Sequence, residues 1–481
     1  MSESEIRSRR PGLGSRAIWP WALFLLSTGL IVAMEAYFRR YAIDGLYFQR
    51  WPSETLMQSV SLRELRSSPV ASLWYLHVQP PITNLIRAAI VVCRRDRSWV
   101  GLMRGVDSDL YHLWSLVSGA LAVLIDAWLR KLQVPRALAL CIALGWLLSP
   151  ANLAFVTLLD GTLLSCLLTT WIVYETWRLG GSEGGSVGRL AAAVLLAYFT
   201  RSLFQWPFLL VMIGAVALQG VSRRRVMAFG ALVSLVVGLY SLKQHYLFGT
   251  VSTSTLEGTN LTRSLGADCS GFAPIPAASD ARLTAPVLME RQKLEGTLSF
   301  NHVERLAVER GLMACYRRTL AERSVASLWS AYATNVGLFL RPSSTSSPNV
   351  IVDRLPWRGP VDWLFSGWRW VTIVLVAGSV GLWRNRRHLR QVLAVAAPCA
   401  YVLAVAVVGE RGENMRFKVF LEPSIWVLLA VQSWFAIRWL WNVTAAGLQR
   451  QAGRATPAVG GTVLRVNLAA TPRTPSGPRP R

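Results

Sequence analysis

The first long polar stretch of the chain contains an acidic residue that could act in catalysis. Glu54 lies in Trp51-Pro52-Ser53-Glu54, among aromatic and apolar neighbours. A partly buried carboxylate holds a proton more readily than a solvated one, which suits a general base that accepts a proton from a hydroxyl group. We therefore predict that Glu54 is such a base and prefer it to Asp44, another carboxylate of the same stretch. A solvated loop carboxylate is the alternative for either residue.

A histidine–proline turn follows in the same stretch, as His77-Val78-Gln79-Pro80-Pro81. Proline fixes φ and favours the first turn of a helix, so the two prolines predict a helix start and fix how the preceding side chains point. We expect His77 and Gln79 to line a pocket there. An ordinary helix start with a polar cap is the alternative.

A third carboxylate, Asp160, lies inside the apolar run from Phe155 to Trp171. An ionised carboxylate inside a membrane costs about 3 kcal/mol or more without a partner, so such residues usually face a cavity. We predict that Asp160 shapes a binding pocket, and a structural ion pair is the alternative. Asp126 differs, because it lies one turn from Arg130 and can be satisfied locally.

Several cations follow apolar runs on the side that the distribution of charge makes the outer one. They are Arg201, Lys243, Arg411 and Arg416. Guanidinium and ammonium groups bind phosphate well, so the group predicts an anion site, with Arg201, Lys243 and Arg416 as its main residues. Each could instead be an interfacial cation whose charge reaches toward water.

The composition is that of a membrane protein with one polytopic domain. The chain has 481 residues, of which 52% are hydrophobic and only 16% are charged, and it contains 21 Trp. Apolar runs long enough to cross a ~30 Å hydrocarbon core recur along it. The first run has a basic start and lacks a clear cleavage site, which indicates a retained signal anchor.

The distribution of basic residues orients this domain. The net charge is +25, but Lys and Arg gather at the ends of apolar runs and in the tails, which is the positive-inside pattern and not that of a nucleic-acid-binding protein. With a basic cytoplasmic N-terminus (1–16), we expect a transmembrane domain over 17–441 and a basic, disordered cytoplasmic tail over 442–481. The ten expected spans are 17–37, 111–129, 137–149, 152–176, 188–200, 203–220, 226–242, 366–383, 390–409 and 419–441.

Two long polar regions, 38–110 and 243–365, then lie outside the membrane. In the first, the short apolar segment 80–92 is expected to lie in the interface. In the second, 324–340 is treated as interfacial or packed against the bundle. Cys269 and Cys315 share the second region, where a disulfide between them is one of two open alternatives.

The order of these features resembles the GT-C superfamily of membrane glycosyltransferases, which includes protein O-mannosyltransferases and aminoarabinose transferases. The similarity rests on motifs spread over most of residues 18–441, which are Glu54 after the first span, Trp74 to Ile82, Leu148-Ser149-Pro150, Thr200-Arg201, Lys243 to Gly249, and Glu413 to Arg416. The resemblance implies an all-α, GT-C-like bundle of about ten transmembrane helices with interfacial helices on the outer face.

The resemblance also implies an activity. The donor would be a sugar on a polyprenyl phosphate, and the acceptor a lipid, glycan or protein of the cell envelope. Glu54 would deprotonate the acceptor, which attacks with inversion, while cations stabilise the departing phosphate. Many members carry Asp or Asp-Glu in the first loop where this chain has Glu54 and Thr55, so the base and any need for Mg²⁺ or Mn²⁺ stay open.

Two other functions remain open from the sequence. One is a transporter or flippase of a lipid-linked or anionic solute, and the other is a non-catalytic partner in envelope assembly. In each case the expected location is the inner (plasma) membrane, in contact with membrane lipids, with both termini cytoplasmic and the site on the outer face.

Overall fold

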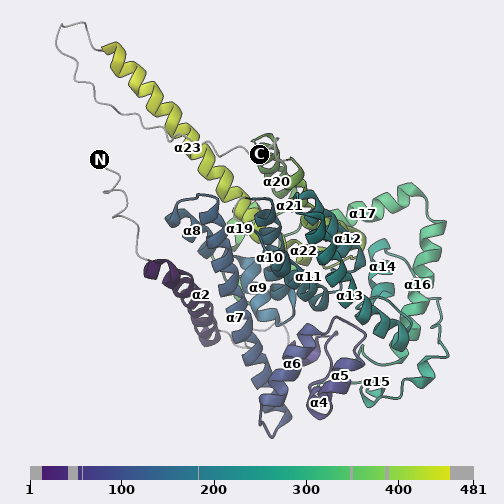
Figure 1. Ribbon diagram of the computed structural model, residues 1–481. Coiled ribbons are helices and arrows are strands. Elements are labelled where there is room, and N and C mark those ends of the chain that lie inside the picture. Colours follow the sequence, from purple (N-terminus) through teal and green to yellow (C-terminus); the bar gives the residue numbers. More distant parts are fainter. Residues whose placement is uncertain are drawn as a thin grey trace. The chain divides into compact units, whose positions relative to one another are not determined.

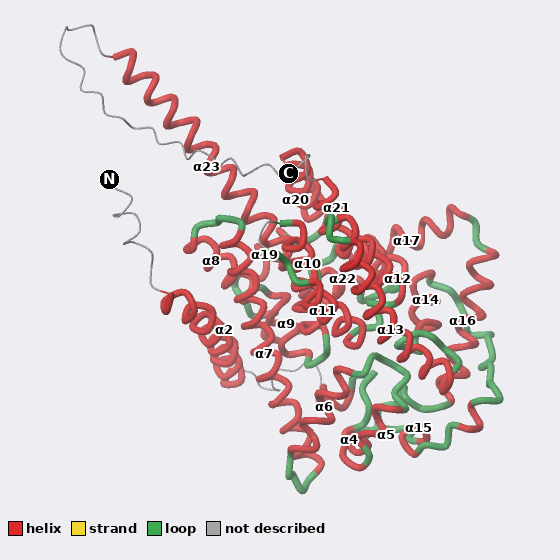
Figure 2. The backbone as a smooth tube through the Cα atoms, viewed as in Figure 1, coloured by secondary structure: helices red, strands yellow, loops and turns green. Residues whose placement is uncertain are grey.

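The computed structural model describes residues 13–41, 52–56, 58–181, 184–346, 350–384 and 389–455. Within these ranges the chain forms helices joined by turns and loops, and the only strand-like pairing is an isolated bridge between Gln292 and Leu298 (Figure 2). The predicted all-α class is therefore confirmed. The chain divides into two units, residues 1–432 and 433–481, and the described part of the second unit is the end of the last helix.

Helices follow one another along the whole described chain (Figure 1). Those of the first half are α2 (Leu13–Tyr41), α3 (Pro52–Thr55), α4 (Leu62–Ser67), α5 (Pro69–Trp74), α6 (Ile82–Cys93), α7 (Trp99–Lys131), α8 (Arg136–Leu147), α9 (Pro150–Leu158), α10 (Thr162–Gly180), α11 (Val187–Thr200), α12 (Trp206–Leu218) and α13 (Arg223–Phe248). Those of the second half are α14 (Glu257–Leu265), η1 (Asp280–Arg282), α15 (Pro286–Met289), α16 (Glu304–Glu322), α17 (Val325–Phe339), η2 (Ser343–Ser346), α18 (Val350–Asp353), α19 (Arg358–Leu364), α20 (Gly367–Arg384), α21 (Leu389–Val408), α22 (Asn414–Lys418) and α23 (Glu422–Ala455).

Four described helices are long and apolar enough to cross a membrane, namely α7, α13, α21 and the Glu422–Leu448 part of α23. Two bent pairs, α8 with α9 and α19 with the start of α20, raise the number to six if each pair is one span. The other apolar stretches, in α2, α6, α11 and α12, are shorter. These helices support a helical membrane protein.

The core of the first unit forms around α7 and α10. Helix α7 packs against α2, α8 and α10, and α10 packs in turn against α11 and α21. Local sequence explains where these helices begin. The Ser98 hydroxyl accepts a hydrogen bond from the Gly101 N–H at the start of α7, and Ser149 caps α9 in the same way before Pro150. Helix α21 contains Pro398 in its interior.

The expected continuous run over 152–176 is not one helix. Helix α9 ends at Leu158 and α10 begins at Thr162, with Asp160 in the break between them. Leu159 has a φ of 58°, the left-handed conformation that ends an α-helix. The sequence Asp160-Gly161 is a turn signal, and it overrides the apolar character of the flanking residues.

Both polar regions fold into short helices. Helix α6 begins directly after Pro81, as predicted, and buries Thr83, Asn84 and Arg87 against its neighbours. Segment 324–340 forms α17, which packs against α21 and α22. Cys269 and Cys315 form a disulfide with a Cα–Cα distance of 6.0 Å, and α14 packs against α16, which carries Cys315. The expected tail over 442–481 is helical to Ala455, and residues 456–481 lie outside the described ranges.

Candidate functional site

The break between α9 and α10 places Asp160 at the first turn of α10. Its Oδ1 accepts a hydrogen bond from the Thr162 N–H at 3.0 Å, and its Oδ2 accepts one from the Thr162 hydroxyl at 2.8 Å. Asp160 is only 5% exposed. A Cβ on Gly161 would lie 2.8 Å from the Thr83 hydroxyl oxygen, so glycine is what lets α6 approach the break.

Two arginines from distant parts of the chain pair with this carboxylate. Arg201, which caps the C-terminus of α11, places Nη1 3.2 Å from Asp160 Oδ2, and Arg416 of α22 pairs with the same oxygen through Nη2. Arg416 also donates from Nε to the Thr162 hydroxyl at 3.0 Å. Burial lowers the pKa of Arg201, and it lowers that of Arg416 to about 10. The two side chains are only 15% and 12% exposed, so two largely buried cations share one carboxylate.

Two further acidic residues extend the cluster. Glu413 accepts a hydrogen bond from Arg416 Nη1 at 2.8 Å, and Glu410 Oε1 lies 3.4 Å from Arg263 Nη2. Burial raises the pKa of Glu410 to about 7, although the nearby Arg263 opposes this shift. Glu410 and Arg263 are not among the site residues predicted from the sequence. Glu410 directly follows an apolar run, and that position is the feature of the sequence from which it could have been predicted as a site residue.

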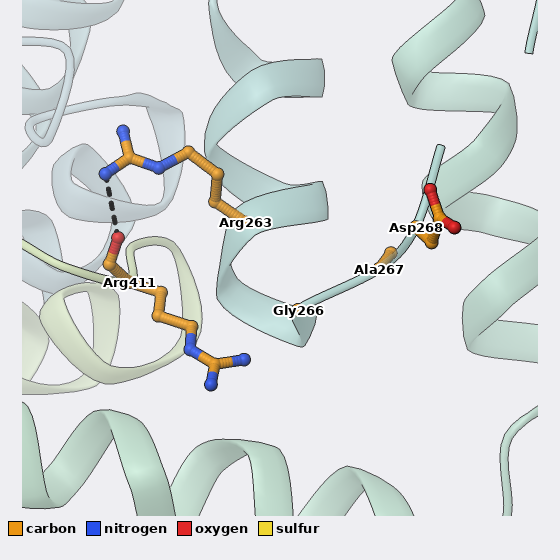
Figure 3. Close-up of a pocket in the computed structure, with 5 residues that line it drawn as sticks. All are labelled: Arg263, Gly266, Ala267, Asp268 and Arg411. Carbon is orange, nitrogen blue, oxygen red and sulfur yellow. Dashed lines mark hydrogen bonds between the residues drawn. The ribbon is translucent and has the colours of Figure 1, made fainter. Parts of the chain in front are cut away.

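A cavity of about 420 Å³ adjoins this cluster. It is lined by Arg263, Gly266, Ala267, Asp268 and Arg411, from the C-terminal end of α14 and the loop before α22 (Figure 3). The Arg263 guanidinium donates from Nη2 to the Arg411 carbonyl at 2.9 Å, which ties the two walls together (Figure 3). Arg411, one of the predicted outer cations, therefore lies at the cavity and not at Asp160.

Glu54, the predicted base, is fully buried and all its contacts are within the protein. Its Oε1 accepts hydrogen bonds from the Ser61 hydroxyl at 2.8 Å and the Leu294 N–H at 2.9 Å. Its Oε2 accepts one from the Leu62 N–H at 2.9 Å and lies 3.8 Å from Arg87 Nη2. Glu54 thus joins the first polar region to the second and does not contact Asp160, Arg201 or Arg416.

A second buried carboxylate, Glu64, lies near Glu54. Both of its oxygens are buried without a hydrogen-bond partner. Burial, reinforced by the charges of Glu290 and Glu54, raises the pKa of Glu64 to about 8. Burial likewise lowers the pKa of nearby Lys293 to about 7, and its ammonium donates to the Ser59 hydroxyl at 3.0 Å.

His77 is also fully buried. Its Nδ1 lies 2.8 Å from the Thr255 hydroxyl, and its Nε2 lies 3.1 Å from the Asn301 carbonyl oxygen. Burial lowers the pKa of His77 to about 3, so the ring is neutral and connects the two polar regions. Gln79, two residues later, is partly exposed.

Lys243 belongs with His77 and not with the arginine pair. Its ammonium lies 5.4 Å from the centre of the Trp74 ring, 5.1 Å from that of Tyr240 and 5.7 Å from that of Phe248. The Phe248 ring in turn lies 5.1 Å from the His77 ring. The predicted site residues therefore lie in three separate places. Asp160, Arg201 and Arg416 lie together in one of them.

The remaining expectations concern Asp44, Asp126 and a metal. Asp44 lies outside the described residues. Asp126 Oδ2 pairs with Arg130 at 2.7 Å, one turn away as expected, while its Oδ1 is buried without a hydrogen-bond partner among the described residues. Among the described residues, no group of three or more His, Cys, Asp or Glu side chains could hold a metal ion. A need for Mg²⁺ or Mn²⁺ stays a prediction of the resemblance.

The chain was compared with known proteins. It matches no family model, and comparisons with curated proteins and with solved structures find no match. Function must therefore be argued from the cluster around Asp160 and its surroundings.

Proposed function

We propose that this chain is an inverting glycosyltransferase that moves a hexosyl or pentosyl group from a polyprenyl-phosphate donor to an envelope acceptor at the non-cytoplasmic face of the membrane. One observation carries the proposal, namely that Arg201 and Arg416 meet at Asp160 in a chain with several apolar helices. Two largely buried guanidinium groups converge here, and Asp160 and Glu413 balance their charges; guanidinium groups bind phosphate well, which suits a donor phosphate at this place.

In this proposal the arginine pair stabilises the leaving group. As the bond from the sugar to the phosphate breaks, negative charge grows on the phosphate, and cations held in place beforehand stabilise it most where water is excluded. Asp160 and Thr162 hold the Arg416 guanidinium in position through an ion pair and a hydrogen bond. Asp160 is therefore a positioning residue, and Arg201 and Arg416 bind the donor phosphate.

Glu54 remains the proposed base. To act, its Oε1 must accept the proton of an acceptor hydroxyl, and that hydroxyl would replace the one of Ser61 that now donates to the same oxygen. The acceptor would enter between the two polar regions that Glu54 connects. His77, Gln79 and Lys243 would then shape the wall of this entrance.

The proposed membrane arrangement has about ten spans with both ends in the cytoplasm of a cell with an inner membrane. It requires the shorter helices α2, α11 and α12, and also α10, to cross together with the longer ones. The Cys269–Cys315 disulfide supports an outer location of the second polar region, because disulfides persist in oxidising compartments.

The test is covalent transfer by the purified protein in lipid vesicles. Vesicles with a radiolabelled polyprenyl-phosphate sugar and an envelope extract are expected to yield labelled acceptor with wild-type protein. Arg416→Gln is expected to reduce the rate at least about a hundredfold, in line with losses seen when one charge-stabilising donor is removed. Arg318→Gln is the matched control, because Arg318 pairs with Glu322 on an exposed helix surface. Equal rates for all three proteins would reject the role of the arginine pair.

The helix break at Asp160 favours a second candidate, a transporter or flippase of an anionic lipid-linked solute. Transporters often place binding sites where a membrane helix is interrupted, and α9 and α10 are interrupted at a buried carboxylate. Movement of the labelled donor across the vesicle membrane without a covalent product would support this candidate and reject transfer.

A further inference from the structure

The cavity beside α14 is formed by two positively charged side chains and a backbone that leaves room for them. Gly266 ends α14 with a φ of +60°. A Cβ at this position would lie 2.0 Å from Arg411 Nη1, so any other residue would push the guanidinium away. The absence of a side chain at Gly266 therefore keeps the Arg411 guanidinium at the cavity wall (Figure 3).

The two arginines of the cavity differ in their interaction partners. Arg263 is held by the Arg411 carbonyl and by Glu410. In the described part of the chain, no carboxylate pairs with the Arg411 side chain within 4.0 Å. Arg411 is thus a partly buried cation that has a positioned backbone and no anionic partner among the described residues.

The opposite end of the cavity carries Asp268 (Figure 3). Its carboxylate accepts a hydrogen bond from the Ser270 N–H at 3.0 Å and is otherwise exposed. A carboxylate can accept further hydrogen bonds from hydroxyl groups. The cavity therefore offers cations at one end and a hydrogen-bond acceptor at the other.

We propose that this cavity binds a molecule with an oxyanion and several hydroxyl groups, such as a phosphorylated or carboxylated sugar unit. Arg411 and Arg263 would hold the phosphate or carboxylate, and Asp268 would accept hydrogen bonds from the hydroxyls. The cavity has a volume of about 420 Å³ and is open to solvent, since Arg263, Gly266 and Asp268 are exposed.

This inference rests on the proposed function, because it makes the cavity a subsite for the acidic end of the acceptor, apart from the hydroxyl that Glu54 would deprotonate between the two polar regions. Glu410 connects the two places: it lies 3.4 Å from Arg263, and its charge also acts on Arg201 of the Asp160 cluster. An acidic acceptor held at Arg411 would therefore lie beside the residues proposed to hold the donor phosphate. The tests use binding, so a protein that binds but does not transfer separates this inference from the proposed function.

The first experiment measures glucose 6-phosphate binding to the full chain in phosphatidylcholine nanodiscs at constant ionic strength. Saturable binding to the wild type is expected, with affinity reduced about tenfold or more in Arg411→Gln. Free glucose and inorganic phosphate, each lacking one half of the recognised group, are expected to bind more weakly. Equal affinity of wild type and Arg411→Gln would overturn the proposal.

A pair of glycine variants separates the effect of the position of the Arg411 guanidinium from the effect of its charge. Gly266→Ala keeps the charge but displaces the guanidinium, so it is expected to lower affinity as Arg411→Gln does. Gly249→Ala is the matched control, because Gly249 also ends a helix with a φ of +70° and a Cβ there would meet nothing within 4 Å. If both glycine variants lose affinity equally, the cavity is not the binding site and the proposal fails.

A second arm identifies the source of the ligand. The measurement is repeated in nanodiscs that contain phosphatidylglycerol, whose headgroup also carries a phosphate and hydroxyls. Competition by this lipid that disappears in Arg411→Gln would assign the cavity to a lipid headgroup, and unchanged binding of glucose 6-phosphate would assign it to a soluble or glycan-borne group. Absence of binding to the wild type in both kinds of nanodisc would overturn the proposal.

Discussion

Thr83 and Arg87 lie one turn apart on the buried face of α6, and each contacts a different part of the candidate site. Thr83 lies against Gly161, next to Asp160, whereas Arg87 Nη2 lies 3.8 Å from Glu54 Oε2. Side chains four residues apart on a helix have Cβ atoms about 5–6 Å apart. Helix α6 therefore fixes the spacing between the proposed base and the arginine–carboxylate cluster.

Asp160→Asn is expected to destabilise the fold, because it removes the carboxylate that pairs with Arg201 and leaves Arg416 with Glu413 alone. Breaking a buried ion pair on one side costs about 3–5 kcal/mol. Thermal unfolding in detergent micelles measures this loss. The double variant Asp160→Asn/Arg416→Gln should recover part of it, and simple addition of the two single losses would show that these residues do not interact.

Glu54→Gln is expected to abolish transfer and also to lower the free energy of unfolding by about 1–3 kcal/mol. The amide cannot accept every hydrogen bond that the carboxylate accepts from Ser61, Leu62 and Leu294. Transfer rate and unfolding midpoint are measured together. Ser61→Ala is the matched control, since it removes one of these hydrogen bonds and keeps the carboxylate. A loss of transfer in Ser61→Ala as complete as in Glu54→Gln would point to a structural role for Glu54.

Glu64 predicts a pH dependence of stability. Its pKa is raised from 4.5 to about 8, so between these values the folded protein keeps a proton that the unfolded chain has lost. Stability should therefore fall as pH rises through this window, and Glu64→Gln should flatten the profile and be more stable than wild type at pH 8. The pKa of Lys293 is lowered to about 7, so Lys293 makes stability rise with pH, but only above about pH 7. The pKa values of Asp107 and Glu410 are also raised, to about 6 and about 7, so the difference between the wild-type and Glu64→Gln profiles of unfolding midpoint against pH isolates Glu64, and parallel profiles would contradict its raised pKa.

The disulfide predicts a specific labelling pattern. Exposed Cys93 should react with a maleimide without reduction, whereas Cys269 and Cys315 should react only after it. Reduction should lower the free energy of unfolding by about 2–4 kcal/mol. A reductant that cannot cross the membrane, applied to intact cells, should expose both thiols if the second polar region is outside. Labelling of Cys315 before reduction would contradict the pairing.

Local patterns in the sequence predicted several elements correctly. The two prolines indicated the start of α6, and α17 forms where an apolar segment was expected to pack. Asp126 pairs with Arg130, one turn away. Each of these features depends on residues close together in the chain, and short-range chemistry is enough to predict them.

Other features depend on contacts between distant residues. The Glu54 carboxylate is buried by the backbone of Leu294, which no pattern around Trp51 to Glu54 reveals. The order of Arg201, Lys243 and Arg416 in the chain also could not show that Lys243 lies among aromatic rings, away from the other two. The break at Asp160 was in principle predictable from Asp160-Gly161, but the surrounding apolar residues favoured one long helix.

The Cys269–Cys315 bond ties completion of the arginine-lined cavity to the redox state of the surroundings. Asp268, at one end of the cavity, directly precedes Cys269, and the bond fixes that segment to α16. A newly made chain whose thiols are still reduced lacks this covalent anchor. Oxidation of the two thiols would thus act as a maturation step that gives the protein its finished cavity.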